Sequence, residues 1–189
     1  MRINNTVSAL NTLNKAIKKY PKFIEAFVAR GQIYTLINLN ETNNLSIGQV
    51  YERIISDYQS VINLLPNRGI GYIGKADALK GIGDYAAALK LYSKAIQLDQ
   101  KEMDKEITVV NKEDVKDSLV NGRFKRARLL YQLKMLDQAS EELNALVKIQ
   151  PENAKAHFYL GKILSNQDPH QEAYIHFEQV ITHNEEPFL

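Results

Sequence analysis

Small and large apolar residues recur along this chain at helical spacing. In the clearest segment, residues 83–99, Ala88, Tyr92 and Ala95 are separated by four and then three positions, which places them on one face of a helix. The alternation of small and large side chains on that face suits two helices that pack closely together. The pattern therefore predicts an amphipathic helix, and it supplies a template for the rest of the chain.

This template occurs five times, and the residue five positions after each copy is proline in three cases. The five sets are Ala9, Leu13, Ala16; Ile54, Tyr58, Val61; Ala88, Tyr92, Ala95; Ala139, Leu143, Leu146; and Ala173, Phe177, Val180. A second pattern precedes all but the first set: Phe27, Arg30, Gly31, Tyr34; Tyr72, Lys75, Ala76, Leu79; Arg123, Arg126, Ala127, Leu130; and His157, Leu160, Gly161, Leu164. The alternation predicts nine helices, of which the first is unpaired, and essentially no sheet.

The two patterns together resemble the tetratricopeptide repeat (TPR), a helix pair with a period of about 34 residues. Pro66 and Gln100 are 34 residues apart, as are Pro151 and Glu185, and the resemblance covers nearly the whole chain. It implies an all-α fold, a right-handed superhelical solenoid of antiparallel helix pairs. It also implies a protein–protein interaction scaffold or adaptor rather than an enzyme.

The repeat spacing divides the chain and locates two insertions. We expect a half repeat (second helix only) at 1–21, a repeat with an inserted loop near 39–49 at 22–66, a repeat at 67–102, an insertion at 103–119, a repeat at 120–151, and a repeat with a tail at 152–189. The polar residues 38–44 are expected to protrude as a loop, and Ser46 with Gln49 to open the next helix as a capping box. Val115 and Leu119 extend the helix that follows the second insertion, whereas residues 107–110 fit a helix or a strand.

The resemblance implies a binding site on a concave wall that the first helix of each pair lines. One column of wall positions is apolar: Val28, Ile73, Phe124 and Phe158. Its neighbours are Gln32, Asp77, Arg128 and Lys162, and Lys155 also faces the wall. We expect a partner peptide or helix there, with apolar anchors and an acidic segment; the alternative is that the apolar column only packs within the fold. Lys155 alone matches the clamp with which one TPR subgroup binds chaperone C-termini, so docking of that kind is not expected.

The helices at the two ends of the chain also predict which partners it binds. The chain begins with an unpaired helix and closes without a polar capping helix, which solenoids usually need. This favours a fragment of a longer protein over ends that a partner covers. We expect self-association, or stacking of further repeats, through the exposed terminal helices.

Composition and charge narrow the alternatives. The formal net charge is +2, well short of the basic excess typical of a nucleic-acid binder. A helical-repeat RNA-binding protein remains the main alternative because Arg123, Lys125, Arg126 and Arg128 are close in sequence, although helical geometry splits them between faces. The chain has no cysteine, no signal peptide and no apolar stretch of membrane-spanning length, so we expect a cytoplasmic location and no membrane partner.

Two motifs suggest chemistry but are better explained by helix packing. Gly69, Gly71 and Gly74 form a literal G-x-G-x-x-G, yet a dinucleotide site needs a preceding strand and a repeat helix is predicted there. Four histidines lie in the last repeat, without the i,i+4 pairing of a helical metal site. We therefore expect no catalytic residue, no metal and no cofactor.

Overall fold

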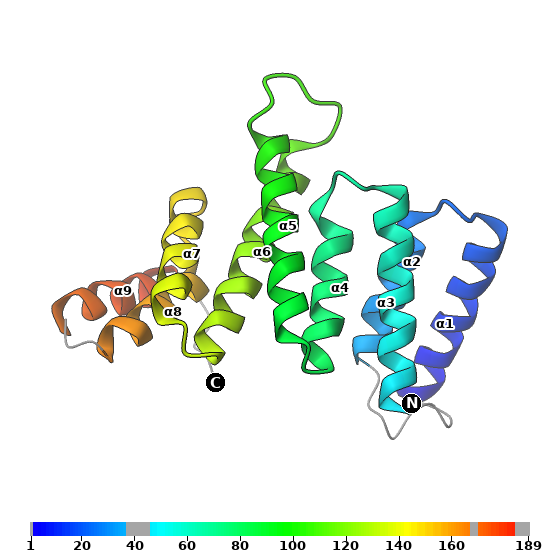
Figure 1. The fold of residues 1–189 in the computed structure, drawn as a ribbon, viewed down its shortest axis with the longest axis horizontal. Coiled ribbons are helices and arrows are strands. Elements are labelled where there is room, and N and C mark those ends of the chain that lie inside the picture. Colours follow the sequence, from blue (N-terminus) through cyan, green and yellow to red (C-terminus); the bar gives the residue numbers. More distant parts are fainter. Residues whose placement is uncertain (1, 37–45, 167–169, 184–189) are drawn as a thin grey trace. The chain divides into compact units, whose positions relative to one another are not determined.

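The computed structural model describes residues 2–36, 46–166 and 170–183, and within these ranges it contains nine α-helices and no strand (Figure 1). The helices are α1 (Arg2–Lys19), α2 (Ile24–Leu36), α3 (Ile47–Leu64), α4 (Gly69–Gly81), α5 (Tyr85–Met103), α6 (Lys112–Gln132), α7 (Leu136–Ile149), α8 (Ala154–Ser165) and α9 (His170–His183). The predicted order of helices and the all-α fold are confirmed. The chain forms two compact units, Met1–Val115 and Lys116–Leu189.

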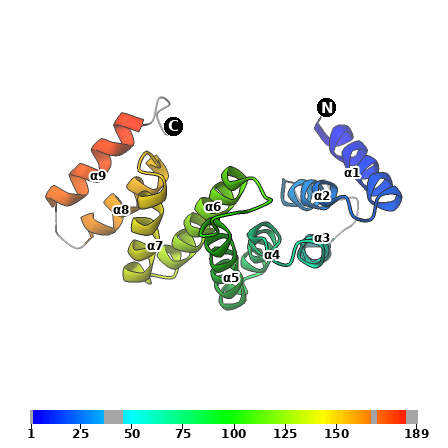
Figure 2. The same ribbon diagram turned by 90° about the horizontal axis from the view of Figure 1, so that it is seen from above.

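In the first unit, each helix packs against the next one in the chain. Figure 2 looks nearly along α2, α3 and α4, which lie side by side. Helix α3 begins with the predicted capping box: the Gln49 backbone N–H donates to Ser46 Oγ (3.3 Å), and the Ser46 N–H donates to Gln49 Oε1 (2.9 Å). The predicted loop at 38–44 lies outside the described residues.

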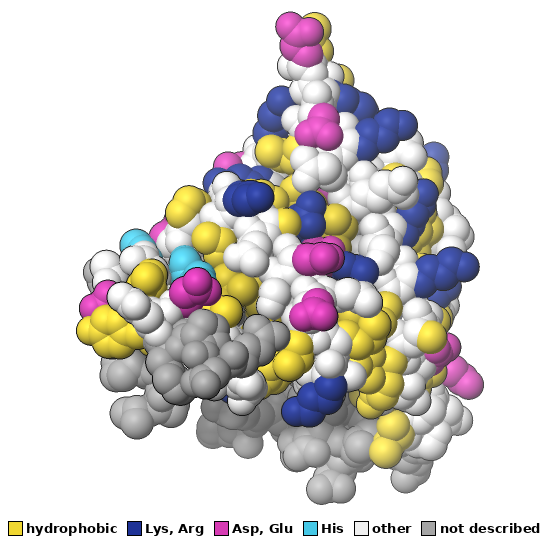
Figure 3. Space-filling view, turned by 60° about the vertical axis from the view of Figure 1, so that its left-hand side comes forward, with side chains coloured by type: hydrophobic (Ala, Val, Ile, Leu, Met, Phe, Trp, Pro, Cys, Tyr) yellow, Lys and Arg dark blue, Asp and Glu magenta, His cyan; other side chains and the backbone are white. Residues whose placement is uncertain are grey.

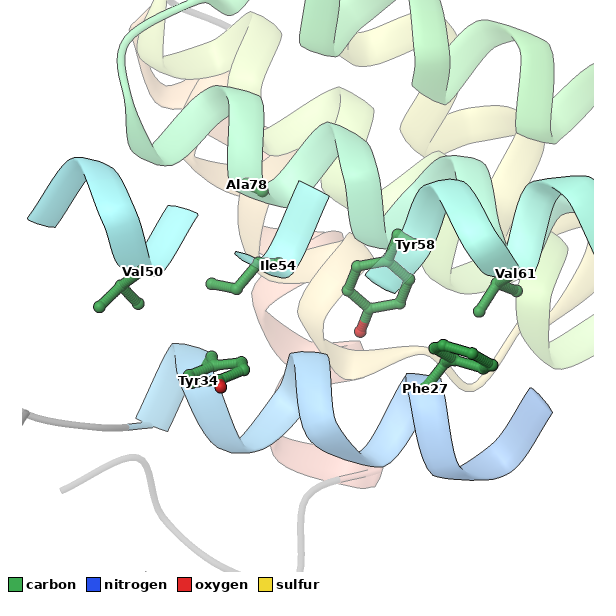
Figure 4. Close-up of a cluster of buried hydrophobic side chains, with 7 residues drawn as sticks. All are labelled: Phe27, Tyr34, Val50, Ile54, Tyr58, Val61 and Ala78. Atoms are coloured by element: carbon green, nitrogen blue, oxygen red, sulfur yellow. The ribbon is translucent and has the colours of Figure 1, made fainter. Parts of the chain in front are cut away.

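A cluster of buried side chains from α2, α3 and α4 forms the core beside α1 (Figure 4). Its members are Phe27, Tyr34, Val50, Ile54, Tyr58, Val61 and Ala78. Leu10 and Ile17 of α1 pack against this cluster, so the apolar side of the unpaired helix is covered by α2. Polar side chains such as Asn11 and Lys15 occupy its exposed side, together with Val7, which is 37% exposed.

Glycines allow large side chains to fit between the helices. The ring of Tyr58 in α3 lies between Gly31 of α2 and Gly74 of α4. A Cβ atom on Gly74 would lie 2.1 Å from Tyr58 Cε1, and one on Gly31 would lie 2.8 Å from Cε2. This arrangement is the small-against-large packing that the sequence pattern predicts.

The G-x-G-x-x-G motif opens α4 and follows a helix, as expected. A Cβ atom on Gly71 would lie 2.9 Å from Ile62 of α3, so this glycine permits close helix packing. The Gly69 N–H donates to Asp99 Oδ1 of α5 (2.8 Å), and Asp99 is fully buried. A carboxylate therefore occupies the positive end of α4 from within the protein.

The second insertion divides between a loop and a helix. Helix α6 begins at Lys112, and its residues Val115 and Leu119 are buried, so the predicted lengthening of this helix is confirmed. Residues 107–110 form neither a helix nor a strand. Ile107 and Val109 in this loop are almost fully exposed.

The second unit continues the small-against-large packing. A Cβ atom on Gly161 of α8 would lie 2.7 Å from the Phe177 ring of α9. Leu143 and Leu146 of α7 are buried, as the template predicts. On the other side of α9, Tyr174, Ile175 and Ile181 are more than half exposed (61%, 53% and 77%).

Candidate functional site

The predicted apolar wall positions of the first unit lie largely inside the fold. Ile73 is only 4% exposed. Val28 is half-buried and packs against the core cluster, whereas Gln32 beside it is exposed. These placements support the packing interpretation of the apolar column for this unit.

Asp77, the predicted acidic wall position, is held by neighbouring side chains. Its Oδ1 accepts a hydrogen bond from the hydroxyl of Tyr92 (2.5 Å), and the Lys80 ammonium lies 3.7 Å away. Burial, together with the charges of Asp77 and Asp57, raises the pKa of the neighbouring Tyr58 to about 12. Asp77 is thus part of an internal polar network.

A buried ion pair that sequence reasoning missed joins three helices of the first unit. Arg30 Nε and Nη2 of α2 donate to the two carboxylate oxygens of Asp57 in α3 (2.9 and 2.5 Å). Arg30 Nη1 also donates to Asn14 Oδ1 of α1 (2.7 Å). Asp57 is buried, and its hydrogen bonds with Arg30 raise the pKa of the guanidinium. Arg30 belongs to the second sequence pattern, but the spacing of that pattern does not predict that Asp57 is its partner.

In the second unit, an aromatic cluster brings several predicted site residues together. The cluster comprises Phe124 and Tyr131 of α6 and Phe158 and Tyr159 of α8. The Tyr159 ring is its centre and meets the other three edge to face, at centroid distances of 5.7 Å (Phe124), 5.3 Å (Tyr131) and 5.7 Å (Phe158). Edge-to-face pairs of this kind contribute about 0.5–1.5 kcal/mol each beyond area burial.

Lys162 lies over this aromatic cluster. Its Nζ is 5.4 Å from the ring centroids of both Tyr131 and Phe158, within the range of a cation–π interaction. Phe158 remains 36% exposed, and Lys155 one turn earlier on α8 is exposed. The structure therefore unites Phe124, Phe158 and Lys162 on one surface of the second unit.

The basic residues of α6 fall into two groups. Arg123 and Arg126 both bind Glu142 of α7, at 2.9 and 2.5 Å. Arg123 and Arg126 thus face α7, whereas Arg128 forms no ion pair with any described residue. On the face that Figure 3 draws, lysines and arginines are interspersed with hydrophobic and uncharged side chains.

The surface around Phe158 combines exposed aromatic area with a positive charge. Like Arg128, Lys155 and Lys162 form no ion pair within the described part of the chain. Lys162 thus lies over an aromatic surface that is partly open to solvent, while Arg128 follows Phe124, and Lys155 precedes Phe158, by one helical turn in the sequence. The sequence signal that could have found its centre is the run of aromatic residues at 158 and 159, opposite positions 124 and 131 that share a helix face.

Neither a cluster of metal-ligating side chains nor a membrane-spanning helix is found in the described part of the chain. Among them, no group of three His, Asp or Glu side chains could hold a metal ion. None of the helices over 2–36, 46–166 and 170–183 combines the length and the apolar character needed to span a membrane. His157 is buried and hydrogen-bonded to His176, in keeping with a structural role.

Comparisons with known proteins agree with this architecture. Models described as tetratricopeptide repeat match residues 71–102 and 124–182. Anaphase-promoting complex subunit 3 of Schizosaccharomyces pombe is 27% identical over 192 residues; the match covers 89% of this chain but spans only 26% of that protein. The crystal structure of MamA has a TM-score of 0.68 at 16% identity, covering 95% of this chain and 89% of that one. The APC/C hetero-tetramer Cut9–Hcn1 gives 0.64 at 17% identity, covering 94% and 28%.

Proposed function

We propose that this chain is a protein–protein interaction scaffold of the tetratricopeptide repeat type and that it binds a peptide or helix of a partner through its second unit. The proposed site is the surface that Phe124, Phe158, Arg128, Lys155 and Lys162 form around Tyr159. The single observation that carries the proposal is the partly exposed Phe158 ring with Lys162 held over it.

The chemistry of this surface indicates the kind of ligand. An aromatic surface gains free energy when it buries apolar side chains, at about 25 cal/mol per Å² before ordering costs. Cations at its border orient an acidic segment more than they raise affinity. We therefore expect a ligand with apolar anchors next to acidic residues and an affinity in the micromolar range, about −8 kcal/mol.

We propose that the four wall positions of the first unit contribute less to partner binding than the surface of the second unit does. Ile73 and Val28 serve packing, because the first is buried and the second lies against the core. Asp77 serves the network with Tyr92, and exposed Gln32 is left as a peripheral contact.

The C-terminal helix supports a second kind of contact. The exposed side chains of Tyr174, Ile175 and Ile181 form an apolar surface on α9 that could pack against another helix. The similarity to a subunit of a multisubunit complex supports an adaptor within a larger protein assembly. We include further repeats or a second copy of this chain among the partners at α9.

The test is a titration with synthetic acidic peptides that carry leucine or phenylalanine anchors, followed by calorimetry or fluorescence polarisation. Phe158→Ala should weaken binding at every salt concentration, because the lost contact is apolar. Arg128→Glu should weaken it mainly at low salt, because exposed charges are screened over about 8–10 Å near physiological ionic strength.

Two matched variants on α5 serve as controls. Tyr85→Ala removes an aromatic side chain of similar exposure (44%), and Lys94→Glu reverses an exposed charge. Both should bind the peptides as the unmodified protein does. Loss of binding in the α5 variants, with Phe158→Ala and Arg128→Glu unaffected, would refute the proposed site.

A further inference from the structure

A pair of histidines joins the last two helices. His157 of α8 is 6% exposed, and its Nδ1 lies 2.8 Å from Nδ1 of His176 in α9. The other ring nitrogen of His157, Nε2, lies 2.8 Å from the carbonyl oxygen of Pro151, in the turn before α8. Both nitrogens of a buried imidazole are thus engaged.

These contacts determine where the protons lie at neutral pH. A carbonyl oxygen only accepts hydrogen bonds, so His157 Nε2 must carry a proton and donate it to Pro151. Neutral His157 then has a lone pair at Nδ1, which must accept from His176. His176 therefore carries its proton on Nδ1, and this proton forms the hydrogen bond between the two rings.

Acidification affects this pair in two steps. A first added proton enters at His176 Nε2 and leaves the Nδ1–Nδ1 hydrogen bond intact. A second proton can enter only at His157 Nδ1, where it would place two N–H groups and two positive charges opposite each other across 2.8 Å. The hydrogen bond is then lost, and the positive charge on His157 is buried.

The surroundings of His176 favour the neutral form. Burial lowers its pKa below the ordinary value of 6.5, and the neighbouring His157 from α8 lowers it further. Glu172, one turn earlier on α9, acts in the opposite direction. Because the folded-state pKa is lowered, the stabilisation is present above about pH 6.5 and is lost as the pH falls through the folded-state value.

We propose that the His157–His176 pair is a proton-sensitive contact that holds α9 on α8 at neutral pH and releases it when the pair takes up two protons. Release would uncover Ala173 and the Phe177 ring, which lies against Gly161 and near Phe158. The contact thus regulates how much apolar surface the end of the second unit presents. This inference does not depend on the peptide-binding proposal.

The experiment measures hydrogen exchange of α9 amides in the full chain between pH 7 and pH 5, expressed as protection factors and with a chelator present. Protection in α9 should fall as the pH is lowered, by up to about tenfold per pH unit for each proton that the pair takes up, while α7 stays protected. His176→Gln keeps an amide donor for His157 and removes one of the two titrating groups, so its α9 protection should depend less steeply on pH. His183→Gln changes an exposed histidine of the same helix and should behave like the unmodified protein.

Equal loss of α9 protection in His176→Gln, or no loss in the unmodified protein, would overturn the proposal. If His176→Gln already lowers α9 protection at pH 7, histidine NMR titration of the unmodified protein tests instead whether the histidine pair causes the loss of protection. Coupled titration of His157 and His176 at the pH where α9 protection falls supports the contact. Loss of protection at a pH where neither histidine titrates refutes it.

Discussion

Replacement of Gly74 by alanine should destabilise the first unit, although alanine is the better helix former. A Cβ atom at this position would lie 2.1, 2.2 and 2.3 Å from three ring atoms of Tyr58. The ring cannot retreat, because Gly31 of α2 lies on its other side and Tyr58 is 6% exposed. Helix α4 must therefore move away from α3, or the ring must leave its position.

The expected cost follows from two opposing effects. Overpacking of a well-packed core costs about 1–3 kcal/mol, and contact with three ring atoms at once places this site at the upper end. Alanine recovers about 1 kcal/mol of helix propensity relative to glycine. The net result is a loss of about 2 kcal/mol in the free energy of unfolding.

Urea unfolding followed by circular dichroism measures this loss as a lower midpoint at constant slope. Gly48→Ala is the matched control, because a Cβ atom there meets only Ser46 Oγ at 3.9 Å in the exposed first turn of α3; it should stabilise slightly. A second variant, Gly74→Ala in a Tyr58→Leu background, should lose much less than Gly74→Ala alone. A Gly74→Ala protein as stable as the unmodified chain would refute the assignment of Tyr58 to this position.

Two further predictions concern a turn and a titration. Lys134 has a left-handed backbone (φ 63°) in the turn before α7, and Gly83 (φ 86°) occupies the corresponding turn before α5. In urea unfolding, Lys134→Gly should therefore stabilise the protein and Gly83→Ala should destabilise it, by about 1 kcal/mol each. A loss of stability in Lys134→Gly would contradict this prediction. Because the pKa of Tyr58 is raised to about 12, the free energy of unfolding should be unchanged below pH 10 and should fall as the pH rises toward 12. Tyr58→Phe cannot ionise and should lose less stability over this interval, which ultraviolet phenolate absorbance combined with unfolding measurements checks.

The two turns show why much of the fold could be predicted. Each ends a first helix with the same hydrogen bonds, from Gly83 N–H to Lys80 O and from Lys134 N–H to Tyr131 O. Gly83 and Lys134 are 51 residues apart, which equals the interval between Gln100 and Pro151 from which the second insertion was inferred. Periodicity locates helices well, because each repeat places the same residue types at the same points of the same local structure.

The candidate site was harder to predict because helix periodicity gives a face but not the neighbour that covers it. Ile73 and Phe158 occupy the same column of the pattern, yet Ile73 is 4% exposed and Phe158 is 36% exposed. A first helix in a repeat array contacts its own partner helix and also the preceding pair, so its inner face can be interior or surface. Spacing alone does not distinguish the two cases.

The features that distinguish the second unit are pairwise contacts that do not repeat. Tyr159 contacts Phe124 and Tyr131 across two helices, and His157 meets His176 across two others. Such contacts depend on which two side chains face each other at one crossing, and no period in the sequence encodes that pairing. The repeating positions build the helix array, whereas the aromatic cluster and the histidine pair give the second unit its own surface. Substitutions at Phe158 or His176 should therefore alter binding or pH response while the helix order persists.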